Sequence, residues 1–204
     1  MPHDPLSHLI SALHTVFSSE EALWLARLVQ SVDPTGEVFY QAIDIPEAIK
    51  DDYILLAYEE RLLLPRMSLP GGAWQDRLLT MGAGVVYFMP LVIKVLMDKA
   101  SGSGVFKPES AIRHVLADTG ADATIVDRML QLFLALQPHA LSRQMEAGLM
   151  DMINRGTTPD LDLHDALDQF VLAGMMSPCP NRSMSSGLAW YEIHPALYWG
   201  TLSR

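Results

Sequence analysis

The stretch that most constrains the fold of this chain is Leu163–Gly200, near its C-terminus. Its first part, Leu163–Gly174, places apolar residues on one face of a helix, and Asp162 can cap the first turn. A short apolar run, Met175–Ser177, then ends at prolines, which tolerate only the edges of a sheet. Beyond a polar loop, Leu188–His194 alternates apolar and polar residues as a strand does. The sequence therefore predicts a helix, a strand, a loop and a second strand, in this order.

This order is typical of the end of a winged helix, in which a β-hairpin, the wing, follows the recognition helix. Asn181–Gly187 has the composition of the wing loop. The closing run, WYEIHPALYWG, resembles the end of the wing in plasmid replication proteins of the RepL type. That pattern is aromatic–x–Ile–Asn–Pro–x–aromatic–Trp, and it is matched here by Tyr191, Ile193, Pro195, Tyr198, Trp199 and Gly200, with His194 in place of Asn. The resemblance implies a winged-helix fold and a role in DNA replication. An arbitrary helix and hairpin in an α+β domain remains the alternative.

An earlier part of the chain repeats this pattern. Leu62–Pro65 lies 113 residues before Met175–Pro178, and in both places an apolar triplet or pair leads into a proline. After a loop, Ala73–Asp76 lies 116 residues before Ala189–Glu192, and both contain Ala-Trp-x-acid. A repeat at this spacing indicates two copies of one domain rather than a solenoid. Chance similarity is the alternative, because few positions are identical.

The remaining pattern predicts mostly helices. We expect them over Pro5–Phe17, Ser19–Val32 (with a Ser18/Glu21 capping box), Pro46–Arg61, Val85–Ala100, Pro108–Leu116, Asp122–Leu136 and Leu141–Asn154. The strands of the first wing are expected over Leu62–Ser68 and Ala73–Met81, and Glu37–Ile43 fits a helix or a strand. Ser101–Gly104 has the composition of a flexible joint.

The expected fold is mostly α with small β-hairpins, an α+β class, and contains tandem winged-helix units joined by a buried helix. The expected domains are residues 1–82, with the N-terminal helices and the first unit, and residues 122–204, with the second unit. Residues 83–121 would connect them.

The charge of the chain argues against nucleic acid and membranes as partners. Its 14 Lys and Arg face 24 Asp and Glu, which gives a formal charge of −10 and a pI of about 5.0. DNA binding draws much of its free energy from cations that neutralise phosphates, so the net field opposes it. The second recognition helix has no Lys or Arg, and the first is expected to present a net acidic set: Glu47, Lys50, Asp51, Asp52, Glu59, Glu60 and Arg61. If DNA is bound, the contacts would come from arginines at the two wings: Arg61, Arg66, Arg77 and Arg182.

Motifs for catalysis, metals and cofactors are missing from the sequence. The histidines lack the spacing that places two imidazoles on one helical face, and there is no P-loop or nucleophile elbow. Gly82–Gly84 lacks the third glycine of a dinucleotide-binding turn. Cys179 is the single cysteine, which fits a reducing compartment, so we expect a cytoplasmic protein. The N-terminus does not read as a signal peptide, and Gly82–Met97 is too short to span a membrane. We expect no enzyme activity, metal or cofactor.

Three functions follow as hypotheses. The first is a non-enzymatic regulatory or interaction protein that binds a protein partner or a second copy of itself, with an interface of aromatic residues: Trp190, Tyr191, Tyr198 and Trp199. These aromatic residues could equally fill the space between the wing and the helices. The second is a DNA-binding regulator of transcription or replication. The third is a ligand binder or small enzyme with a pocket at the domain junction near Gly82–Gly84.

Overall fold

The computed structural model describes residues 4–66, 73–135, 139–141, 144–148, 162–186 and 189–199. Its helices are α1 (Pro5–Leu13), α2 (Ser19–Gln30), α3 (Glu47–Glu59), α4 (Leu91–Ser103), α5 (Pro108–Ala117), α6 (Ala123–Leu134), α8 (Leu163–Leu172) and α9 (Pro180–Ser186). Its strands are β1 (Glu37–Phe39), β2 (Leu64–Pro65), β3 (Val86–Phe88), β4 (His139–Leu141), β5 (Gln144–Gly148), β6 (Met176–Pro178) and β7 (Trp190–Ile193). Three 3₁₀ helices are η1 (Tyr40–Ala42), η2 (Trp74–Asp76) and η3 (Pro195–Tyr198). The predicted α+β class, mostly helical with small antiparallel sheets, is confirmed.

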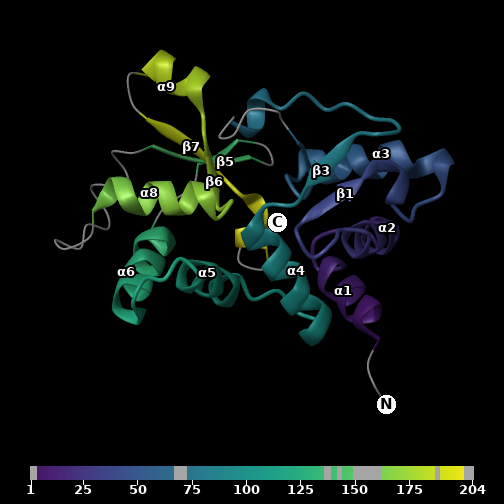
Figure 1. Cartoon of the computed structure of the whole chain (residues 1–204), viewed down its shortest axis with the longest axis horizontal. Helices are drawn as coiled ribbons and strands as arrows, with labels where there is room; N and C mark the ends of the chain where they lie inside the picture. Colours follow the sequence, from purple (N-terminus) through teal and green to yellow (C-terminus); the bar gives the residue numbers. More distant parts are fainter. Residues whose placement is uncertain are drawn as a thin grey trace.

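The two sheets share one connectivity. In the first, β3 lies between β1 and β2 and is antiparallel to both. In the second, β7 lies in the same way between β5 and β6, and β4 extends the sheet beyond β5. A helix, α3 or α8, precedes the second strand of each trio. In Figure 1, α1–α3 and the first sheet occupy one side of the molecule, α5, α6 and α8 occupy the other, and α4 lies between them.

Two residues that are 113 positions apart also share an unusual backbone conformation. The residue after the C-cap of α3 is Arg61 and that after the C-cap of α8 is Gly174, and both have left-handed φ values, of 60° and 72°. Glycine takes this conformation freely, whereas a residue with a Cβ is strained by about 1 kcal/mol. The expectation of tandem winged-helix units rests on this repeat and on the strand order, and it stays a prediction.

The predicted return strand of the first wing is wrong. Ala73–Met81 contains η2 and no strand, and β3 takes the place of the return strand in the sheet. Side chains occupy the backbone groups that a strand would use: the Ser177 hydroxyl accepts from the Trp74 amide, and the Tyr58 hydroxyl donates to the Arg77 carbonyl. The 116-residue match between the two Ala-Trp motifs therefore does not reflect equivalent strands.

Two further elements differ because proline fixes where a helix begins. The expected helix over Val85–Ala100 starts only at Leu91, since Pro90 is its N-cap, and β3 occupies the residues before it. The expected loop over Asn181–Gly187 is instead helical as far as Ser186, because Pro180 opens α9 and the Ser183 amide donates to the Cys179 carbonyl.

Two predictions made from sequence pattern and composition are wrong, because hydrogen bonds determine a different local structure. The helix expected over Leu141–Asn154 is replaced by the end of β4 and by β5, which pairs with both β4 and β7; residues 149–154 lie outside the described residues. The flexible joint at Ser101–Gly104 is the last turn of α4. The hydroxyls of Ser101 and Ser103 donate to carbonyls one turn earlier, and Gly104 is the left-handed C-cap.

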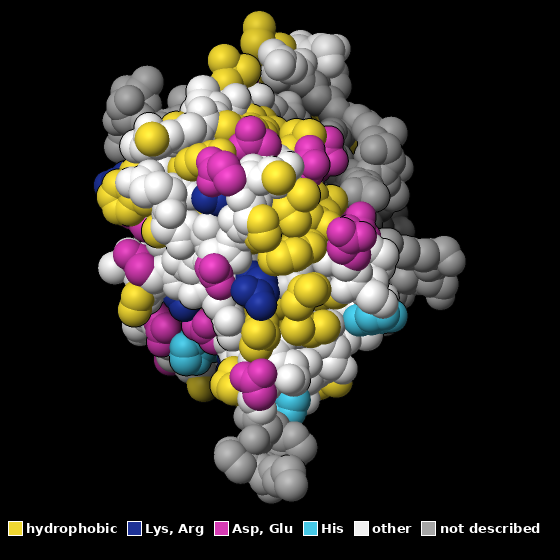
Figure 2. Space-filling view, turned by 90° about the vertical axis from the view of Figure 1, so that its right-hand side faces the viewer, with side chains coloured by type: hydrophobic (Ala, Val, Ile, Leu, Met, Phe, Trp, Pro, Cys, Tyr) yellow, Lys and Arg dark blue, Asp and Glu magenta, His cyan; other side chains and the backbone are white. Residues whose placement is uncertain are grey.

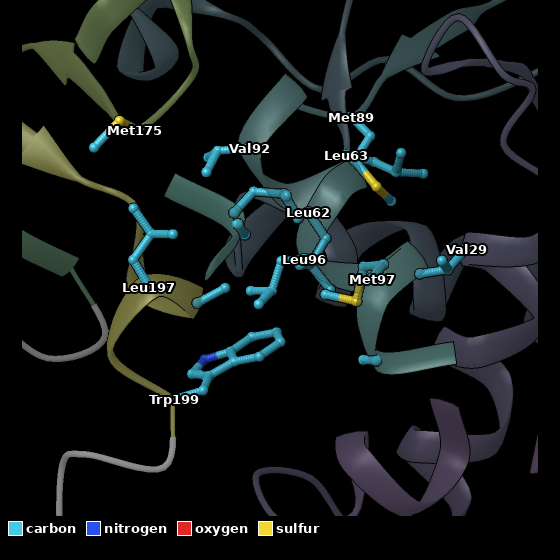
Figure 3. Packing of buried hydrophobic residues seen from close by; sticks show 14 of the residues in the cluster. Val29, Leu62, Leu63, Met89, Val92, Leu96, Met97, Met175, Leu197 and Trp199 are labelled. Carbon is cyan, nitrogen blue, oxygen red and sulfur yellow. The ribbon is translucent and has the colours of Figure 1, made fainter. Parts of the chain in front are cut away.

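One hydrophobic cluster joins the N-terminal and C-terminal halves of the described chain. It includes residues of α1, α2, α4, α5, α6 and α8 and of the C-terminal segment. Figure 3 shows Leu62, Leu96 and Trp199 together at its centre, each from a different part of the chain. Each fully buried leucine contributes about 1.5–3 kcal/mol to stability. The central α4 is the buried connecting helix that the sequence predicts, although it is shorter.

Candidate interaction surface and buried junction

A surface between α2 and α3 carries the residue types that dominate protein interfaces. The rings of Trp24 and Tyr53 lie 6.1 Å apart, and the Arg27 guanidinium lies 5.5 Å from the Trp24 ring centre. All three side chains are partly exposed. Burial, followed by the nearby Glu20 carboxylate, raises the pKa of Tyr53, so its hydroxyl stays protonated. Trp, Tyr and Arg are enriched among residues that contribute most to binding between proteins.

Carboxylates surround this trio. Arg27 Nη1 forms an ion pair of 3.2 Å with Asp44, whose side chain is 81% exposed. Beyond the larger effect of burial, the carboxylates of Glu20, Glu21 and Asp52 lie close enough to Tyr53 to raise its pKa. The solvent-facing side of α3 also exposes three acidic residues and a leucine: Glu47, Asp51, Glu59 and Leu55. Figure 2 views the side of the molecule that holds α1–α3, and shows hydrophobic and acidic side chains interleaved with few basic ones. The face is therefore both apolar and negative.

The basic residue of α3 does not reach this face. The helical pattern predicts an outward Lys50, but this prediction is wrong, because Lys50 is 5% exposed. Its ammonium contacts Glu47 at 2.8 Å and lies 5.1 Å from the Tyr40 ring centre. The Tyr40 hydroxyl donates to Asp51 at 2.9 Å, and this bond is the main cause of a raised Tyr40 pKa. These contacts hold the N-terminal turns of α3 against η1 and leave its carboxylates in solvent.

The helix α8, which the sequence predicts to be the second recognition helix, is also acidic. On α8 the exposed side chains include His164, Asp165, Asp168 and Leu172, and the helix contains no Lys or Arg. Asp162 caps α8, as predicted, because its carboxylate accepts hydrogen bonds from the backbone amides of His164 and Asp165. Because both helices present carboxylates, phosphates would be repelled at each of them.

The candidate DNA-contact arginines differ in burial and in pairing. Arg61 is 6% exposed, so the prediction that it contacts DNA is wrong. Arg66 is largely exposed and paired with Glu37 at 2.7 Å. Arg77 is partly buried, which lowers its pKa, and it lies over the Phe88 ring at 4.6 Å. Arg182 lies in α9, away from the other three in the sequence.

Arg61 instead forms a buried junction with the C-terminal strand. Its Nε donates to Glu192 Oε1 at 2.7 Å, and the Glu192 residue is 0% exposed. Its carbonyl accepts from His194 Nε2 at 2.9 Å, while His194 Nδ1 accepts from the Ala196 amide. Burial lowers the pKa of His194 to about 3, so the ring is neutral. The Trp74 ring packs edge-on against His194 at 5.5 Å. This cluster joins the N-terminal and C-terminal halves of the chain and is shielded from solvent.

The four candidate interface aromatics divide between surface and core. Trp199 is 8% exposed and packs against Phe17 and Phe106, with ring centres 5.3 and 5.0 Å away, so its assignment to an interface is wrong. Trp190, Tyr191 and Tyr198 are partly buried, and burial raises the pKa of both tyrosines. The alternative interpretation, that these aromatics fill the space beside the helices, therefore holds for Trp199.

The residues that sequence reasoning missed are Trp24, Arg27 and Tyr53. Trp24 and Arg27 are three residues apart on an amphipathic helix and lie outside its apolar stripe, which is a signal for an exposed aromatic. Tyr53 lies one position before the buried Ile54 on α3. Their proximity depends on the packing of α2 against α3, which the sequence alone does not give.

A cavity of about 380 Å³ lies between the N-terminal and C-terminal halves of the chain, but not at Gly82–Gly84. Those glycines take left-handed φ values in the connection to β3, and the Gly84 amide donates to Gln41. Among the described residues, no three metal-binding side chains gather, and no helix is long and apolar enough to cross a membrane.

Comparisons with known proteins place the chain in a family without giving a role. No curated protein and no solved structure matches it. A family model matches residues 9–199, which is nearly the whole chain and includes both sheets and the buried junction. The chain therefore belongs to the family that this model describes.

Proposed function

We propose that this is a non-enzymatic cytoplasmic interaction protein, built from two winged-helix-like units, that binds a protein partner through its α2–α3 surface. The observation that carries the proposal is the charge of the recognition helices. The single cation of α3 is buried, and α8 has none, while both helices expose carboxylates. The strand order of the two sheets supports winged-helix units, and the presence of a single, buried cysteine, Cys179, supports a reducing compartment.

The partner surface that fits is basic with an apolar centre. Trp24 and Tyr53 offer aromatic area, and Asp44 and Asp52 offer charges at the rim. Charges at a rim mainly steer encounter and set specificity, whereas buried aromatics supply affinity. Two copies of this acidic surface would repel each other. We therefore favour a different protein as the partner over self-association through this surface.

The test compares proteins captured from the source cells by four immobilised forms. We expect Trp24→Ala and Asp52→Lys each to reduce the same bound proteins by about tenfold or more. The control variant Leu78→Ala/Met184→Ala, which alters side chains 82% and 85% exposed elsewhere, should capture as the wild type does. Asp52 is exposed, so its variant remains informative if Trp24→Ala folds poorly. Capture that is unchanged in both surface variants would contradict the proposal.

DNA binding is the second candidate, because the repeated helix, strand and hairpin order is favourable to it. Its contacts would be limited to Arg66 and Arg77 at the first wing and Arg182 in α9. A mobility-shift assay with mixed duplex at about 50 mM salt decides between the two, since phosphate contacts are strongest at low salt. We expect no retardation. A shift that weakens with salt and is lost in Arg66→Ala/Arg77→Ala would support DNA binding instead.

A further inference from the structure

The junction cavity is formed by both repeats. Its first wall comes from the segment after β2 and from the region where β3 leads into α4, and its second wall comes from the end of α8 and from β6. Its volume, about 380 Å³, lies in the range of about 300–1,000 Å³ that is typical of small-molecule sites. Such sites are frequent where two units meet.

The charge of the cavity is opposite to that of the protein. The described residues that line it include Arg77 and Lys94 and no Asp or Glu. The chain as a whole carries a formal charge of −10, so a lining with two cations and no carboxylate differs from its surroundings. The positive end of the α4 dipole adds to this field, because Pro90 and Leu91 at its start also line the cavity.

Both cations are held in place. Arg77 Nη1 donates to the Pro65 carbonyl at 3.1 Å, and its guanidinium lies over the Phe88 ring. The Lys94 ammonium is 2.9 Å from Asp98, which lies one turn along α4 and is not part of the lining. Positioned cations lose less entropy when they bind an anion than free side chains do.

Apart from Thr35 and Ser177, the other side chains of the lining are apolar. Trp74 is 5% exposed and is fixed by its amide bond to Ser177, and Met176 is fully buried. At the mouth, Leu172 is 75% exposed and Leu91 is 52% exposed. An apolar wall with a few convergent charges is the general character of a ligand site.

We propose that this cavity binds a small organic anion, with a carboxylate near Arg77 and Lys94 and an apolar body against Leu91 and Leu172, the accessible apolar side chains of the lining. The proposal is independent of the α2–α3 surface. Charge complementarity selects the anion, and the apolar walls select an organic molecule over an inorganic one.

The probes are octanoate and 2-naphthoate, each compared with its uncharged primary amide and with inorganic phosphate by calorimetry and ligand-observed NMR. We expect at least one carboxylate to bind about tenfold more tightly than its amide, the size of effect expected from hydrogen bonds to a charged group, and phosphate not to bind. Equal affinity of acid and amide, binding of phosphate, or no binding of either carboxylate at about 1 mM would overturn the proposal.

Two matched pairs of variants locate the site. Leu172→Asp places a carboxylate at the mouth, and Leu78→Asp makes the same change at a leucine that is 82% exposed and outside the lining. Lys94→Met and Lys99→Met remove one charge each from α4, and only Lys94 lines the cavity. We expect Leu172→Asp and Lys94→Met to weaken carboxylate binding by about tenfold or more, and the controls to leave it unchanged. Equal effects within each pair would overturn the assignment of the site to this cavity. Because Leu172 is exposed, Leu172→Asp should fold normally, so its pair still tests the assignment if Lys94→Met is unstable.

Discussion

At the scale of single residues, His194 shows how burial fixes a protonation state. Its Nε2 bonds a carbonyl and must donate, whereas Nδ1 bonds an amide and must accept, so the two contacts define one neutral tautomer. Protonation would place a second cation beside Arg61 in a site without solvent. The RepL-like pattern has Asn at this position, and Asn can also accept an amide hydrogen bond without titrating.

The low pKa of His194 predicts that stability falls with acid. The pKa is about 3 in the folded protein against an ordinary 6.5, so the unfolded chain takes up the proton first. The stabilisation is complete above about pH 6.5 and is lost progressively toward pH 3, by at most about 1.4 kcal/mol per pH unit. Urea unfolding between about pH 6.5 and 5, above the range of ordinary carboxylates, should show this loss in the wild type and much less in His194→Asn. Parallel curves for the two proteins would show that His194 is not the cause.

At the scale of elements, the capping signals of helices were reliable, whereas the strand patterns were right for β6 and β7 and wrong for Ala73–Met81. Ser18 with Glu21, Asp122 and Asp162 cap their helices as predicted, because a cap is formed by residues within one turn. A strand of three or four residues depends on partners elsewhere in the chain. The Ala-Trp motif at Ala73 has the pattern of a strand. However, the Trp74 amide donates to the Ser177 hydroxyl, and the Arg77 carbonyl accepts from the Tyr58 hydroxyl.

The contact between α4 and α8 depends on one glycine. A Cβ on Gly174 would lie 2.6 Å from the Pro90 Cβ, and the Val92 amide donates to Ala173 beside it. We expect Gly174→Ala to lower the free energy of unfolding by about 2–4 kcal/mol, from left-handed strain and overpacking together. Gly120→Ala is the control, because Gly120 has φ of 83° but open space around it, and should cost about 1–2 kcal/mol. Equal costs in denaturant titrations would mean that Pro90 moves aside.

At the scale of the whole molecule, the sequence predicted the class and the repeated helix and strand, but not how the halves meet. Arg61 and Glu192 are 131 residues apart in the chain and were assigned to a DNA contact and to a strand face. Neither periodicity nor composition reveals such a pair, because each residue alone has the properties of a surface side chain. The cavity lined by Arg77 and Lys94 was missed for the same reason, since its walls come from separate segments.

Breaking the Arg61–Glu192 pair should destabilise the whole protein rather than one half. Arg61→Gly relieves backbone strain but leaves a buried carboxylate without this partner, and we expect a net loss of about 3 kcal/mol. The double variant Arg61→Gly/Glu192→Leu should recover part of that loss, because no buried charge remains. Since one cluster of buried residues joins the chain, fluorescence and circular dichroism should report a single transition in every variant. Two separate transitions, or no recovery in the double variant, would contradict this coupling.

The left-handed residue after α3, Arg61, also has a consequence for dividing the chain. At the matching position after α8 the chain has a glycine, which needs no counter-ion, whereas Arg61 has its counter-ion 131 residues away. A fragment that ends between Arg61 and Glu192 would present the guanidinium to water without this carboxylate. We therefore expect neither half, expressed alone, to keep the structure that it has in the full chain.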